Sequence, residues 1–134
     1  MSYENVEEFL RKMKIPQAAS PRLLADDVMK KRYNHLIEEA NEFAHSNAMS
    51  DLDGVVDSLI DVVYVALGTA SMLGLTQDQW EDCFERVHIA NMQKRAVKDE
   101  GGHKLGVEKP EGWEAPNFKG ILEQEEEYPV NGEL

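Results

Sequence analysis

Two acidic clusters inside apolar helical sequence are the residues best suited to chemistry. The first is Glu38-Glu39-Ala40-Asn41-Glu42, and the second consists of Asp57 and Asp61. Residues three or four apart lie on one face of a helix, so the acids within each cluster are neighbours. No basic residue lies within a helical turn of either aspartate. Because burying an unpaired carboxylate is costly, a divalent cation is the explanation that these residues favour.

Carboxylate ligands predict which cation would bind. Four or five carboxylate oxygens around one cavity suit Mg²⁺ or Mn²⁺, whereas zinc prefers Cys and His ligands at a spacing that this chain lacks. Two alternatives are weighed against this site. The Glu42-Phe43-Ala44-His45 spacing occurs in di-iron bundles, but those need the motif on two helices. The second alternative, which remains open for Glu38 taken alone, is that this residue simply lies on a solvated helix face.

Two long helices must position these acids. The stretch from Leu52 to Leu73 is apolar nearly all the way round, which predicts a central, buried helix that stops at Gly74. A preceding helix is expected from near Leu23 to about Ala44. Its predicted core stripe consists of Tyr33, Leu36, Ile37, Ala40, Phe43 and Ala44. A short turn between the two helices, capped by Ser50 or Asp51, would bring the acidic clusters together in an antiparallel hairpin.

The rest of the chain predicts two more helices and a tail. A short first helix ends before Pro16, and a fourth helix begins after the capping residue Thr76. Six of the nine glycines and three of the five prolines lie in 101–134, without a sustained period. We therefore expect an all-α fold in a single domain, 1–134, with a helical core at about 5–98 and an irregular tail at about 99–134.

A second group of polar residues lies at the end of the fourth helix. Asn91 shares a helix face with Lys94 and with Arg95, so a cationic helix end is available to contact phosphate oxygens. Compensation of the helix dipole is the simpler explanation and remains open. In the tail, Lys109 either extends this phosphate clamp or is solvated. Trp113 either contacts a nucleotide base or anchors the tail.

Composition excludes several classes of protein. With 14 basic and 26 acidic residues, the net charge is −12, which argues against a nucleic-acid binder and against anionic membrane surfaces. Asp57 and Asp61 interrupt the longest apolar run, and the N-terminal residues are polar, so no membrane span or signal peptide is expected. A single cysteine, Cys83, favours a reduced compartment. We expect a cytoplasmic protein.

With these pieces assembled, the chain resembles the all-α nucleotide pyrophosphohydrolases, the MazG-like superfamily that includes dimeric dUTPases and phosphoribosyl-ATP pyrophosphohydrolases. Their pattern is Glu-Glu-x-x-Glu on one helix and Glu-x-x-Asp on the next. Residues 38–42 match the first half, and Asp61 matches the final aspartate. Ser58 stands at the usual glutamate position, with Asp57 beside it as the obvious substitute. The resemblance covers about residues 5–122 and extends to Lys109-Pro110-x-Gly112-Trp113.

The resemblance implies a four-helix bundle core assembled as a homodimer or a dimer of dimers. It also implies hydrolysis of a (d)NTP between the α and β phosphates, giving (d)NMP and pyrophosphate. Two or three Mg²⁺ or Mn²⁺ ions would be held by Glu39, Glu42, Asp57 and Asp61. Glu38 would orient or deprotonate the attacking water, or hold an extra ion. The substrate would be contacted by Asn91, Lys94, Arg95, Lys109 and Trp113.

Within the superfamily, the chain most resembles phage MazZ-type (d)GTP diphosphohydrolases, which implies conversion of (d)GTP to (d)GMP in phage nucleotide metabolism. The alternative within the class is a broad or pyrimidine-specific dNTP house-cleaning pyrophosphatase. The alternative from another class is a non-catalytic acidic helical binding or inhibitor protein, which would spread its charge over an outer surface. A nucleotide-binding regulator that keeps the metal site without turnover is a third possibility.

Overall fold

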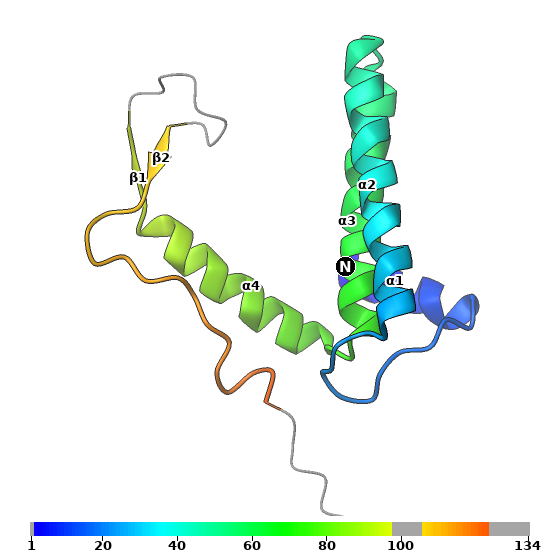
Figure 1. The fold of residues 1–134 in the computed structure, drawn as a ribbon, viewed down its shortest axis with the longest axis horizontal. Coiled ribbons are helices and arrows are strands. Elements are labelled where there is room, and N and C mark those ends of the chain that lie inside the picture. Colours follow the sequence, from blue (N-terminus) through cyan, green and yellow to red (C-terminus); the bar gives the residue numbers. More distant parts are fainter. Residues whose placement is uncertain (1, 98–105, 124–134) are drawn as a thin grey trace, which may run out of the picture. The chain divides into compact units, whose positions relative to one another are not determined.

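The computed structural model of the protein describes residues 2–97 and 106–123. The elements of these residues, shown in Figure 1, are α1 (Ser2–Lys12), α2 (Asp26–Ala48), α3 (Leu52–Met72), α4 (Gln77–Met92), β1 (Arg95–Ala96) and β2 (Val107–Glu108). The predicted all-α fold class is confirmed. The chain divides into two compact units, one containing α1, α2 and α3 (the hairpin unit) and one, Asp78–Glu123, containing most of α4 and both strands (the α4 unit).

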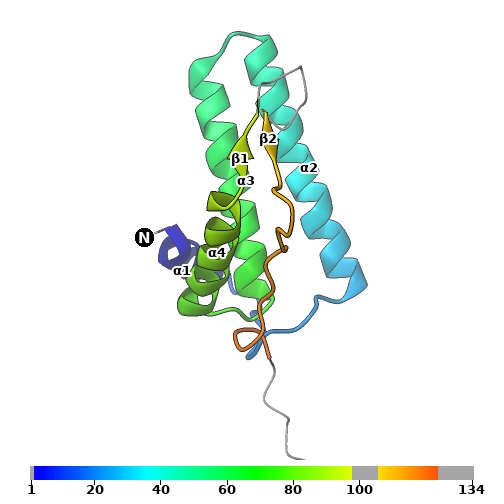
Figure 2. The same ribbon diagram turned by 90° about the vertical axis from the view of Figure 1, so that its left-hand side faces the viewer.

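In the hairpin unit, α2 and α3 lie side by side as the predicted antiparallel hairpin (Figure 2). The turn between them is short because Ser50 adopts a positive φ of 55° and the Asp51 amide donates to the Ser46 carbonyl at 2.9 Å. The Asp51 side chain then caps α3 by accepting a hydrogen bond of 3.0 Å from the Gly54 amide. This cap confirms one of the two residues expected to begin the helix.

Arg32 links the two helices toward the end of the hairpin that lies away from the turn. Its Nε donates to Thr69 Oγ1 and its Nη2 donates to the Val65 carbonyl, both at 3.0 Å. Partial burial lowers the pKa of this guanidinium from its ordinary value. Both acceptors are on α3, so the two hydrogen bonds fix α2 against α3 along the helix axis.

The other end of α3 is held by α1 and by the loop that precedes α2. Tyr3, Val6 and Leu10 of α1 are buried, and the Tyr3 hydroxyl donates to the Leu75 carbonyl at 2.6 Å. The helix stops before Gly74, as predicted, with φ at +93°. A Cβ at this glycine would lie 2.4 Å from the Ser20 carbonyl oxygen, so both the conformation and the space require glycine.

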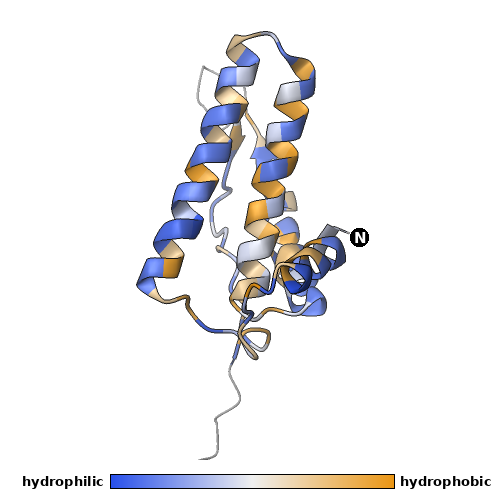
Figure 3. Ribbon diagram, turned by 90° about the vertical axis from the view of Figure 1, so that its right-hand side faces the viewer, coloured by the Kyte–Doolittle hydropathy of each residue, from blue (hydrophilic) through white to orange (hydrophobic). Residues whose placement is uncertain are grey.

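Within the hairpin unit, α3 is not buried all round as predicted. Its buried residues include Ser58, Val65 and Leu67, whereas Val56, Ile60 and Val63 are 48–56 % exposed. The predicted core stripe of α2 is also largely exposed, and no residue of α2 is fully buried. The reason is geometric: α1 and α2 cover only part of α3, which remains the more apolar of the two long helices (Figure 3).

The length and composition of α3 also meet the criterion for a helix that spans a membrane. A core helix of a soluble protein passes the same test, and α3 carries Asp57 and Asp61 in its interior, where a bilayer tolerates charges poorly. We therefore interpret α3 as a packing helix with one side left uncovered within the hairpin unit.

In the α4 unit, β1 and β2 form an antiparallel ribbon in which Arg95 pairs with Glu108 and Ala96 with Val107. This ribbon was not predicted. The irregular segment after it packs along α4, because Arg86 Nη1 donates to the carbonyls of Asn117 at 3.1 Å and Lys119 at 2.8 Å. The remainder of the predicted tail, 99–105 and 124–134, lies outside the described residues. That the whole chain acts as a single domain stays a prediction.

Candidate functional site

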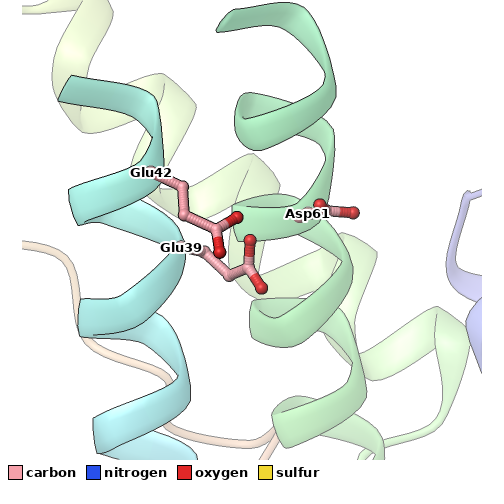
Figure 4. A group of neighbouring side chains, drawn as sticks. All are labelled: Glu39, Glu42 and Asp61. Carbon is pink, nitrogen blue, oxygen red and sulfur yellow. The ribbon is translucent and has the colours of Figure 1, made fainter. Parts of the chain in front are cut away.

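Three carboxylates from the two predicted clusters meet in the hairpin. Ligand oxygens of Glu39, Glu42 and Asp61 all lie within 4.8 Å of one another. Figure 4 shows the two glutamates projecting from α2 toward α3, where Asp61 is placed. Glu39 and Glu42 share a face because they are three residues apart on one helix. The predicted antiparallel hairpin thus brings two acids of the first cluster to one acid of the second, and the binding of a metal by these residues stays a prediction.

Glu39 is the most enclosed of the three acids. Its side chain is 13 % exposed, and its Oε1 lies 3.4 Å from Nε2 of His35, one turn earlier on α2. Its Oε2 is buried and has no hydrogen-bond partner within the described residues. Burial raises the pKa of the Glu39 carboxyl, and the charges of Glu42 and Asp61 raise it further.

These observations test whether the residues fit a metal ion. A buried carboxylate oxygen without a partner is costly, and two further carboxylates nearby add repulsion instead of relief. A divalent cation among the three would satisfy the orphaned oxygen and reverse the sign of the local electrostatics. The cluster therefore fits a metal ion, and oxygen ligands alone favour a hard cation such as Mg²⁺ or Mn²⁺.

Asp57 does not belong to this group. It is exposed within the hairpin unit, so the expectation of a buried position for Asp57 does not hold in that unit. The neighbouring residue Ser58 is only 4 % exposed and takes the inward position, since successive residues point about 100° apart around a helix. The inward position therefore carries a hydroxyl, and a role for Asp57 as a metal ligand stays a prediction.

Glu38 is likewise exposed and lies outside the group of three. Glu38 directly precedes Glu39 on α2. Its side chain is exposed to solvent and is not one of the three converging carboxylates. Such a position suits a residue that acts on a water molecule better than one that holds an ion, and its role stays a prediction.

Four of the five residues predicted to contact substrate come together in the α4 unit. Asn91, Lys94 and Lys109 line a cavity of about 690 Å³, together with Val107 and Glu108. The ammonium groups of Lys94 and Lys109 lie 5.2 and 4.9 Å from the centre of the Trp113 ring. Arg95, the fifth, instead forms a salt bridge with Glu108 across the ribbon.

Sequence reasoning missed three features of these sites. His35 was not singled out, although its spacing of four residues from Glu39 is a helical signal. The inward position of Ser58 was noticed only as a departure from a family pattern. The ribbon that brings Lys109 beside Lys94 rests on two-residue strands, which are too short to show an alternating pattern.

A comparison with protein families places these sites in context. The family model for phosphoribosyl-ATP pyrophosphohydrolase matches residues 5–91, more than half of the chain. The matched range includes Glu39, Glu42 and Asp61 and ends before Lys94. No curated protein matches the chain significantly.

Proposed function

The chain belongs to the phosphoribosyl-ATP pyrophosphohydrolase family, and from this premise we propose that it is a metal-dependent nucleoside triphosphate pyrophosphohydrolase. It cleaves a (d)NTP between the α and β phosphates to give the (d)NMP and pyrophosphate. The observation that carries the proposal is the orphaned oxygen of Glu39 among three converging carboxylates. An acidic binding or inhibitor protein would gain nothing from turning these charges inward.

Each residue has a role in this reaction. Glu39, Glu42 and Asp61 would hold Mg²⁺ or Mn²⁺, which would neutralise charge at the phosphates and lower the pKa of a water molecule. Glu38, exposed on the same helix, orients the attacking water and accepts its proton. The bridging oxygen between the α and β phosphates leaves with its bonding electron pair as part of pyrophosphate. Lys94 donates hydrogen bonds to a β or γ phosphate oxygen.

The substrate is proposed from resemblance to the phage MazZ-type enzymes. It is (d)GTP, converted to (d)GMP in phage nucleotide metabolism. The family model names phosphoribosyl-ATP, which has the same triphosphate chain and is a second candidate. Both substrates require the same metal chemistry, so the carboxylate site does not distinguish them.

The uncovered apolar stripes of the hairpin support a homodimer or homotetramer. Met29, Tyr33 and Ile37 on α2 are 44–58 % exposed and recur at a spacing of four residues. Val56, Ile60 and Val63 on α3 form a second exposed stripe, at spacings of four and three residues. Since such stripes need a matching apolar surface, we propose that a second copy of the chain covers them, as the resemblance implies.

The experiment is a comparison of kcat/KM values for dGTP, dATP, dCTP, dUTP and phosphoribosyl-ATP, each with Mg²⁺ or Mn²⁺. We expect dGTP to be the best substrate. The matched variant is Asp61→Asn, which keeps the side-chain volume but removes a charge, and it should lose most of the activity. A higher kcat/KM for dCTP or dUTP would contradict the guanine preference. Full metal-dependent activity in Asp61→Asn would contradict the site.

A further inference from the structure

Trp113 is fixed at the end of α4 by two hydrogen bonds. Its indole Nε1 donates to the Ala90 carbonyl at 2.8 Å, and its backbone amide donates to the Pro110 carbonyl at 3.0 Å. Ala90 is buried near the last turn of the helix. Both the position of the indole and its orientation are therefore set by the α4 unit itself, without any ligand.

Two lysines from different segments approach this ring. Lys94 follows α4 and Lys109 follows β2, and each ammonium lies within the distance at which a cation is attracted to an aromatic ring. Neither lysine forms an ion pair with a carboxylate in the part of the chain that the structure describes. The acid nearest in the ribbon, Glu108, is already paired with Arg95. Among the described residues, the two positive charges are thus held close to one ring without a carboxylate partner.

The cavity beside these lysines determines what the arrangement can bind. Lys94, Lys109 and Asn91 contribute its hydrogen-bond donors, and its volume of about 690 Å³ is typical of small-molecule sites. Trp113 is not among the residues that line it. The ring therefore contacts the two lysines without being one of the residues that line the cavity.

We propose that Trp113 is a positioning residue, whose ring holds the ammonium groups of Lys94 and Lys109 at this cavity so that both donate to one polyphosphate anion. The proposal rests on the proposed function for the identity of that anion, the pyrophosphate portion of the substrate. Contact between Trp113 and the base stays a separate prediction. Lysine side chains are flexible, so a ring that restricts both reduces the conformational entropy lost on binding. An anion that bridges them also relieves their mutual repulsion.

The test measures binding of inorganic pyrophosphate by calorimetry in EDTA, without any divalent metal. Trp113→Leu removes the aromatic face, and we expect it to weaken pyrophosphate binding by about 10-fold while leaving the affinity for deoxyguanosine unchanged. Trp113→Phe restores a ring without the indole N–H and should recover part of the loss. Lys119→Met, an exposed lysine of the same unit outside the cavity, is the charge control and should bind normally.

A spectroscopic arm keeps the proposal testable if Trp113→Leu does not fold. In a Trp80→Phe background, Trp113 is the sole tryptophan, and saturating pyrophosphate should change its fluorescence because the adjacent ammonium groups engage the anion. An unchanged emission would overturn the proposal. So would equal pyrophosphate affinity in the wild type and Trp113→Leu, or a selective loss of deoxyguanosine binding. The binding and fluorescence measurements do not depend on turnover. If the protein hydrolysed no substrate, the proposed function would be refuted, but pyrophosphate binding could still be interpreted.

Discussion

Replacing Glu39 with glutamine should stabilise the metal-free protein. Burial and the charges of Glu42 and Asp61 raise the pKa of this carboxyl, because each of them destabilises its ionised form. Two unit charges 4.8 Å apart repel by about 1 kcal/mol in water and about 3 kcal/mol at the effective dielectric near a protein surface. Glu42 is exposed, which favours the lower value for that pair.

Some of this gain is offset because glutamine leaves a neutral polar atom where Oε2 has no partner. We expect a net stabilisation of about 1–2 kcal/mol for Glu39→Gln in EDTA, which corresponds to a rise in Tm of about 3–8 °C for a domain of this size. The wild type should gain stability when Mg²⁺ is added, by about 2.7 kcal/mol at a concentration of 100 times the Kd. The variant should gain little, because a ligand has been lost.

The assay is thermal unfolding of both proteins in EDTA and in saturating Mg²⁺, followed by circular dichroism. Glu38→Gln is the matched control, since it removes the same charge from the adjacent, exposed position of α2. Its Tm in EDTA should rise by less than that of Glu39→Gln. The electrostatic reasoning is refuted if Glu39→Gln is less stable than the wild type in EDTA and responds to Mg²⁺ equally.

Three further predictions concern pH, backbone and assembly. Burial and the nearby Glu7 raise the pKa of Tyr3 to about 12, so its contribution to stability is complete below pH 10 and disappears as the pH rises toward 12; urea titrations of Tyr3→Phe should lack this decline. Gly74→Ala should lower stability by about 2 kcal/mol or more, measured by urea unfolding, because its Cβ would collide with the Ser20 carbonyl and its φ is positive. Ile60→Asp should dissociate the assembly in analytical ultracentrifugation, whereas Ile60→Val should not; an unchanged mass in both would place the interface elsewhere.

The elements were predictable because hydrophobic period and capping are local properties of the sequence. The third helix was expected to be capped by Ser50 or Asp51 and to reach Leu73, and α3 spans Leu52–Met72. The preceding helix was expected to end at about Ala44 but continues to Ala48. Its hydrogen bonds persist through Ser46 and Asn47, and the chain reverses only at Ser50, where φ becomes positive. Polar residues in the last turn were mistaken for the end of the helix.

The choice of helix face could not be made from one chain. The most apolar stripe of α2, with Tyr33 and Ile37, was assigned to the core of the chain, yet Arg32 and Glu39 are less exposed than either. Periodicity identifies an apolar face but not whether the same chain or a second copy covers it. The carboxylate site was predictable because it depends on helical spacing within the hairpin. The approach of Lys94 and Lys109 to the Trp113 ring could not be predicted in this way, because it depends on contacts between distant segments of the α4 unit.

The most direct test of the central claim is ³¹P NMR of an equimolar mixture of the four deoxynucleoside triphosphates incubated with the protein and Mg²⁺. We predict that monophosphate and pyrophosphate resonances grow together in equal amounts, and that Asp61→Asn abolishes both. Release of inorganic phosphate with formation of nucleoside diphosphates would contradict cleavage between the α and β phosphates. The assignment of the Glu39, Glu42 and Asp61 cluster as a hydrolytic metal centre would be contradicted if neither the deoxynucleoside triphosphates nor phosphoribosyl-ATP were cleaved with Mg²⁺ or with Mn²⁺.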